Sequence, residues 1–270
     1  MPITADLGGK NYTLGKGRVF FDRFADGVIV TANTQGEGER YFGNTPEFSI
    51  SSAAESLEHF SSEGGIKTKD DDVQLSLSRT GKTNVDHISS ENLALLALGV
   101  NNTVTQTSQV GLITVFTAAK RGRFYQLGVS ASNPSGLRKV SNVVVKKGAP
   151  GYATTVTPTG NYQFDADLGR LYIEENAPGI NNEDIQVTFD TAATTYDQVV
   201  SGTKSIYGAL RFVADNPKGT NRDYYFPYVK MAPDGDYALK GEEWMTIGFT
   251  FEVLKKASNI EAMYIDGRPA

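Results

Sequence analysis

Two segments of the chain alternate between apolar and polar residues with the period of two that is typical of β-strands. Residues 47–51 place Phe48 and Ile50 on one face, and residues 73–78 place three aliphatic side chains on one face. Their other faces carry mainly serine, which is small and neutral, and the pattern predicts a sheet with a smooth polar wall. The acidic, glycine-containing stretch between them, residues 54–72, is expected to be a long loop.

Similar patterns extend the β prediction over most of the chain. Residues 245–253 alternate in the same way, with a second hydroxyl-rich polar face, and strand signals separated by Gly, Pro and Asn turns recur between 103 and 190. One helix is expected after Ser89 or Ser90, where apolar residues recur at helical spacing as far as Gly99. The predicted fold class is all-β with one short helix, a β-sandwich or half-barrel.

The turn-rich segments also predict how the chain is divided. Residues 1–129 and 204–270 are expected to form the main β domain, and residues 130–203 a small inserted β subdomain. The single tryptophan, Trp244, falls in an alternation that resembles a buried strand.

Composition limits the classes of function. Hydrophobic residues make up 39% and charged residues 21%, which is ordinary for a globular protein and argues against general disorder. The absence of cysteine excludes disulfides and cysteine chemistry. Neither a signal peptide nor a membrane-spanning run is expected. With a net charge of −5, the protein lacks the excess of basic residues that is typical of proteins that bind nucleic acid tightly.

The residues that could carry chemistry do not form a recognisable site. His59 and His87 lack companions at metal-ligand spacing, and the aspartates 70–72 diverge on an extended segment. No nucleophile elbow, zinc-protease or phosphate-loop motif occurs. The sequence therefore predicts neither an enzyme nor a cofactor or metal site.

Charge is unevenly distributed along the chain. Residues 116–147 carry seven basic and no acidic side chains, whereas 163–190 carry seven acidic side chains against one arginine, and 54–72 carry six acidic side chains against two lysines. Such blocks are either ordinary solvated surface or complementary patches that steer copies of one protein together. Both interpretations remain open at this point.

Several segments resemble one known family. They are GKGRVFFDRF at residues 15–24 and GERYFGNTPE at 38–47, followed by residues 58–62, 69–71, 88–94 and 161–173. They are similar to the major tail tube proteins of long-tailed, non-contractile (siphovirus-type) bacteriophages, and the strongest part of the resemblance is 15–98.

The resemblance implies a structural virion protein whose hexameric rings stack into a hollow tail tube that conducts phage DNA into the host cell. It implies assembly in the host cytoplasm, with tape-measure and tail-tip or terminator proteins as partners, and DNA passing the lumen without specific binding. The inserted subdomain is expected to decorate the outer surface, in a structural role or in weak adhesion to the host.

Two sets of residues then receive expected roles. The lumen is expected to be lined by Glu47, Ser49, Ser51, Gln74, Ser76 and Ser78. Contacts between rings are expected from Glu55, Glu58, His59, Glu63, Lys67, Lys69, Asp70, Asp71 and Asp72.

Rival interpretations remain. A β-sandwich module that binds carbohydrate or a host surface would expose aromatic side chains in its loops, for which Tyr237 and residues 224–226 are candidates. A glycan-hydrolysing enzyme is disfavoured, because no acid pair or aromatic cleft can be singled out. A tail-terminator or baseplate protein of the same fold would stop at a single ring.

Overall fold

The computed structural model describes residues 12–268, and over that range the protein is all-β with one short helix, as the alternation predicted. The chain forms two compact units. Unit 1 comprises Met1–Asn102 and Val199–Ala270, and unit 2 comprises Thr103–Gln198. The chain passes between them in β5 (Val100–Gln106) and β13 (Thr194–Val200), which pair as a two-stranded sheet.

The inserted unit therefore begins earlier than residue 130, and that part of the sequence-based boundary is wrong. The reason is strand pairing between segments that are distant in sequence. β6 (Gln109–Ala119) pairs with β12 (Glu183–Thr191), and β7 (Arg123–Gln126) pairs with β11 (Arg170–Ile173). The strands before residue 130 thus belong to the insertion.

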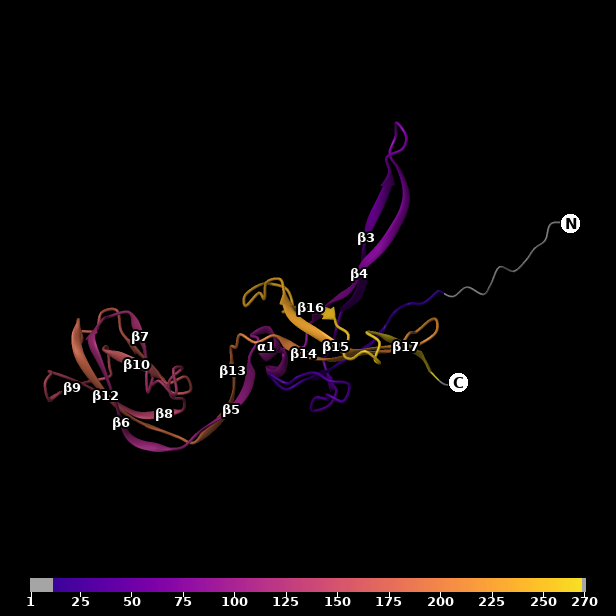
Figure 1. Ribbon diagram of the computed structural model, residues 1–270. Coiled ribbons are helices and arrows are strands. Elements are labelled where there is room, and N and C mark those ends of the chain that lie inside the picture. The colour runs from indigo at the N-terminus through magenta and orange to yellow at the C-terminus, as the bar shows by residue number, and fades with distance from the viewer. Residues whose placement is uncertain (1–11, 269–270) are drawn as a thin grey trace. The chain divides into compact units, whose positions relative to one another are not determined.

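Unit 1 is built on an eight-stranded antiparallel sheet with the order β2-β1-β14-β15-β16-β4-β3, and β17 pairs with β15 beside the end of β16 (Figure 1). β3 and β2 are the edge strands. The strands are β1 (Gly17–Arg23), β2 (Arg40–Tyr41), β3 (Glu47–Ser61), β4 (Thr68–Val85), β14 (Ile206–Ala214), β15 (Arg222–Asp234), β16 (Ile247–Val253) and β17 (Tyr264–Gly267).

The stretch predicted as a long loop is mostly strand. β3 and β4 continue as a paired hairpin to Ser61 and Thr68, so the prediction of a loop over residues 54–72 is wrong, and the turn is confined to residues 62–67. Acidic residues are depleted in strands, which is why the sequence indicated a loop. Pairing of each strand with the other satisfies the backbone groups that a solvated loop would leave to water.

One face of this sheet forms the core of unit 1. Alternate residues of the central strands point to the same side and are buried there, and aromatic rings dominate the cluster. Phe48 of β3 stacks on Phe251 of β16 at 5.5 Å and on Phe212 of β14 at 5.4 Å between ring centroids. The sheet is therefore strongly curved, because its edge strand reaches across to β14.

The helix α1 (Ser90–Leu96) packs on this core through Leu95, and contacts β15 and β16. The side chain of Ser89 caps it by accepting a hydrogen bond from the Asn92 amide, which satisfies one of the helix's free N–H groups. Asn92 is fully buried and donates to the carbonyls of Phe42 and His87, while Arg40 donates to its Oδ1 at 2.8 Å. Burial lowers the pKa of Arg40, although Glu91 opposes that shift.

Replacing Asn92 by Ala is expected to lower the free energy of unfolding by about 1–3 kcal/mol for each buried group that loses its partner. Urea denaturation would measure the loss, and Asn101→Ala, an exposed site in the same unit, is the matched control. Equal stability of the two variants would contradict the role assigned to the Asn92 hydrogen bonds.

Unit 2 consists of two sheets around its own core. The four-stranded sheet has the order β6-β12-β8-β9, and the three-stranded sheet has the order β10-β11-β7. Buried side chains of both sheets form one apolar cluster, which includes Val187 of β12 and Leu171 of β11. The remaining strands are β8 (Val140–Lys147), β9 (Thr154–Val156) and β10 (Tyr162–Asp165).

Candidate assembly surface on the long hairpin and its sheet

The outer part of the β3–β4 hairpin extends beyond the rest of the unit 1 sheet. β16 pairs with β4 only from Val85 to Arg79, so residues 68–78 of β4 pair with β3 alone. We call residues 53–78 the arm; Figure 1 shows it projecting from the strands of unit 1. A two-stranded hairpin is marginally stable in water unless something packs against it.

Large apolar side chains of the arm are exposed. At the tip, Ile66 is 82% exposed, and in the strands Leu57, Val73 and Leu75 are 58–64% exposed. An exposed apolar surface of this kind is typical of a site covered by another molecule. The alternation of apolar and polar residues thus continues into the arm, where the sheet of unit 1 no longer buries the apolar side chains.

Charged side chains cross-link the two strands of the arm. His59 Nδ1 lies 2.5 Å from Asp70 Oδ1, and Lys69 Nζ lies 2.9 Å from Glu58 Oε1 and 3.6 Å from Asp72 Oδ2. The hydrogen bond to Glu58 is the main cause of the raised pKa of Lys69. Because these groups are solvated, such pairs stabilise the arm little and mainly set its charge pattern.

The structure brings together the nine residues expected to make inter-ring contacts. Glu63 and Lys67 lie in the turn, and the other seven lie on the paired strands. Ser76 donates to Glu55 across the strands at 3.3 Å. Whether these residues contact another ring stays a prediction.

Five of the six residues expected to line a lumen share one sheet face. Residues directly opposite in an antiparallel pair lie on the same side, and alternation extends that side along each strand. The five are Glu47, Ser49, Ser51, Ser76 and Ser78. A bulge at Leu75 separates Gln74 from Ser76, and Gln74 pairs with Ser56, so the register does not place Gln74 with the other five.

The same face continues across the neighbouring strands. Lys82 pairs with Ser49 on one side and with Thr250 on the other, and Thr250 pairs with Ala232. Sequence reasoning missed Lys82 and Asp234, whose side chains form a 3.0 Å ion pair on this face, because only the strand order brings them together. The face is hydroxyl-rich, and Lys82 is paired with a carboxylate. A second lysine, Lys230, lies on the same face, opposite Glu252 in the strand register.

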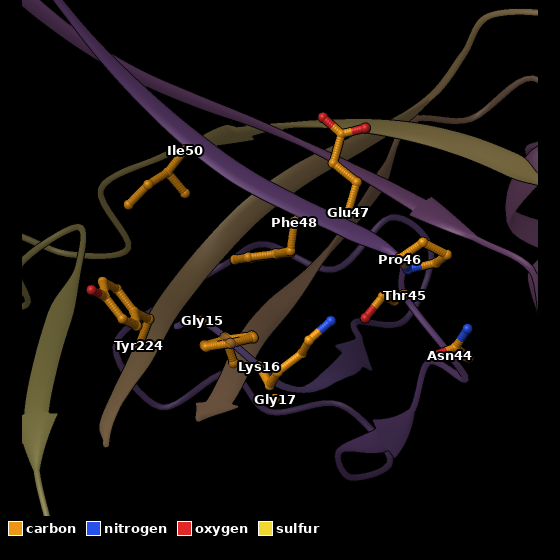
Figure 2. Close-up of a pocket in the computed structure, with 11 residues that line it drawn as sticks. Gly15, Lys16, Gly17, Asn44, Thr45, Pro46, Glu47, Phe48, Ile50 and Tyr224 are labelled. Atoms are coloured by element: carbon orange, nitrogen blue, oxygen red, sulfur yellow. The ribbon is translucent and has the colours of Figure 1, made fainter. Parts of the chain in front are cut away.

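A groove lies where the edge strand β3 curves over the beginning of β1. Its volume is about 530 Å³, and Figure 2 shows Phe48 and Ile50 facing Gly15–Gly17 and Tyr224 across it. It is lined by Gly15, Lys16, Gly17, Asn44, Thr45, Pro46, Glu47, Phe48, Ile50, Phe212 and Tyr224. An adjoining cavity of about 340 Å³ shares Gly15, Phe212 and Tyr224 and adds Arg222.

Trp244 is not a core residue, which corrects the interpretation of its alternation. It is 93% exposed in the segment between β15 and β16, where Leu239 is 80% exposed. The buried alternation begins three residues later, at Ile247. The segment that exposes both a tryptophan and a leucine is a second candidate contact surface, since tryptophan is enriched at protein interfaces.

Over residues 12–268, no group of three or more His, Asp or Glu side chains is arranged to hold a metal ion. In the same range no helix is long and apolar enough to cross a membrane.

Comparison with protein families matches residues 12–264 to the model of a family described as "Protein of unknown function UCP028589". No curated protein matches the chain.

Proposed function

Since the chain belongs to the family of proteins of unknown function UCP028589, its role is inferred from its own residues, and we propose that it is a structural subunit of a phage tail tube. Copies of the chain assemble into rings that stack into a hollow conduit, and DNA passes through it. Tape-measure and tail-tip proteins are the expected partners, and the virion tail is the expected location.

The observation that carries this proposal is the arm. A two-stranded hairpin with exposed Leu57, Val73 and Leu75 is stabilised when another chain covers it. A copy of the same chain is the simplest such partner, and repetition of a contact that is not two-fold symmetric produces rings or filaments. The open edge of β3 is a further surface that pairing between copies would protect.

The polar sheet face supports the conduit in particular. Each free cation on a lumen wall adds sequence-independent attraction to DNA phosphates, which would slow the passage of DNA. The face presents Ser49, Ser51 and Ser78, and its Lys82 is paired with Asp234. The other lysine of this face, Lys230, lies opposite Glu252 in the strand register. A wall with two lysines, each accompanied by a carboxylate, offers DNA few anchors.

The test is negative-stain electron microscopy of the purified protein, with light scattering to measure mass. Hollow tubes or six-fold rings are the expected result. A monomer that stays monomeric when concentrated, and also when mixed with a tail-tip initiator complex, would contradict the proposal. Single rings that never stack would instead indicate a terminator or baseplate protein.

Assembly is also expected to shield Trp244. Because it is the only tryptophan, its fluorescence reports one site, and its emission should shift to shorter wavelength, with weaker quenching by acrylamide, as assemblies form. The control is the same protein diluted until light scattering shows a monomer. Identical spectra in both states would show that the segment around Trp244 stays in water and takes no part in the contacts.

A further inference from the structure

The tip of the arm carries apolar side chains that unit 1 itself cannot cover. Ile66 is 82% exposed and Phe60 is 45% exposed. They lie at the far end of β3 from its first residues, Glu47–Ile50, which line the groove described above. Ser61 lies eleven positions after Ile50, a distance of roughly 35 Å along an extended strand. The tip of one chain therefore does not reach the groove of the same chain.

The groove is suited to receive the apolar side chains of the arm tip. Its floor is apolar, because Phe48 and Phe212 stack there with nearly parallel rings, and Tyr224 meets Phe212 edge-on. A Cβ atom added to Gly15 would meet no heavy atom within 4 Å, so the wall at Gly15 borders open space. The groove thus has room for an apolar side chain from outside.

The charges of the two surfaces also match. Six acidic side chains against two lysines occupy residues 54–72, and the turn holds one of each, Glu63 before Ile66 and Lys67 after it. Lys16 and Glu47 line the groove, where Figure 2 shows the Glu47 carboxylate pointing away from Lys16, and Arg222 lines the adjoining cavity. The Lys16 backbone is held by Asn216 and Asp215, while its side chain is exposed and makes no ion pair among residues 12–268. The arm, which is net acidic over residues 54–72, is attracted to the basic side chains of this rim.

We propose that the groove between Gly15–Gly17 and Asn44–Ile50 receives the arm tip of a second copy of the chain, with Ile66 on the aromatic floor and Glu63 beside Lys16. This inference rests on the proposed self-assembly and names the surface that accepts the arm. Each copy donates one arm and accepts another, so the contact is head-to-tail and propagates along a ring or a filament.

Disulfide trapping tests the pairing directly, because the chain contains no cysteine. One sample carries Ile66→Cys and a second, differently tagged sample carries Thr45→Cys in the groove. Mixing and mild oxidation are expected to give a covalent heterodimer in about tenfold excess over the same mixture with Asn101→Cys, an exposed control site of unit 1. Equal yields for Thr45→Cys and Asn101→Cys would overturn the proposal.

Filling the groove is a second, independent test. Gly15→Leu is expected to raise the protein concentration needed for assembly about tenfold by occupying the space of the tip. Gly267→Leu is the matched control, since a Cβ atom there also meets nothing within 4 Å. Assembly of Gly15→Leu at the wild-type concentration would overturn the proposal.

Charge reversal tests the rim. Lys16→Glu and Glu63→Lys are each expected to weaken assembly about tenfold, and the double variant is expected to restore it. Double-variant assembly as weak as that of the single variants would count against contact between the two residues.

These outcomes separate the groove from the proposed function. Tubes that form without any disulfide between the Ile66→Cys and Thr45→Cys chains would contradict docking of the arm tip in the groove, but not the proposed tube. A disulfide-linked heterodimer of those two variants, in a protein that never forms rings or tubes, would support docking of the arm tip in the groove and contradict the proposed tube. If Ala5→Cys instead forms a bond with Thr45→Cys within one chain, the groove belongs to residues 1–11 and the proposal fails.

Discussion

Replacing Ala54–Leu77 by an Asn-Gly turn is expected to leave a folded monomer that no longer assembles. Ala53 and Ser78 are directly paired in the hairpin, and Asn-Gly closes a two-residue β-turn between paired strands. The buried cluster of unit 1 includes no residue of the deleted segment, so thermal unfolding should remain cooperative. The deletion removes Leu57, Val73, Leu75 and the tip at once, so the loss of assembly should be complete.

The measurement is light scattering and negative-stain microscopy of the shortened protein beside the full chain, over one concentration series. Circular dichroism controls for folding. Tubes formed by the shortened, folded protein would show that the arm is dispensable. That outcome would remove the main support for assembly through the arm and for the groove as its acceptor.

Two lysines introduced on the polar face are expected to make assembled tubes retain duplex DNA. Ser51→Lys and Ser78→Lys suit this test, because Ser49 lies opposite Lys82 and a lysine there would face a like charge. Each phosphate contact should steepen the dependence of log Kobs on log[salt] by about 0.9, and every copy in the tube contributes. Wild-type tubes are expected to retain little DNA.

Co-sedimentation of tubes with short duplexes over a series of salt concentrations would measure this effect. Thr154→Lys with Thr155→Lys adds the same charge at exposed sites on β9 of unit 2 and is the matched control. Equal retention by both double variants would mean that DNA binds any added charge, and the polar face would lose its assignment to the lumen. Strong retention by wild-type tubes would argue against a conduit with few anchors.

Local patterns predicted the elements of this protein well where the chain buries one face. The alternation in residues 245–253 corresponds to β16, and Ser89 caps the expected helix. These local patterns failed where the exposure of a residue differs from what its type usually indicates. Residues 54–72 resemble a loop because they are acidic, yet all of them outside the turn at 62–67 form paired strands, and Trp244 resembles a core residue yet lies in solvent.

The sequence by itself determined that the protein is all-β with one short helix, and that one side of several strands carries mainly small, polar side chains. These properties follow from residue type and a period of two, which each strand carries independently. The tertiary structure decided which strands are neighbours. It paired Lys82 with Asp234, started the insertion at Thr103, and curved β3 over Gly15–Gly17 to form the groove. Such features depend on contacts between segments that are far apart along the chain, which no local pattern encodes.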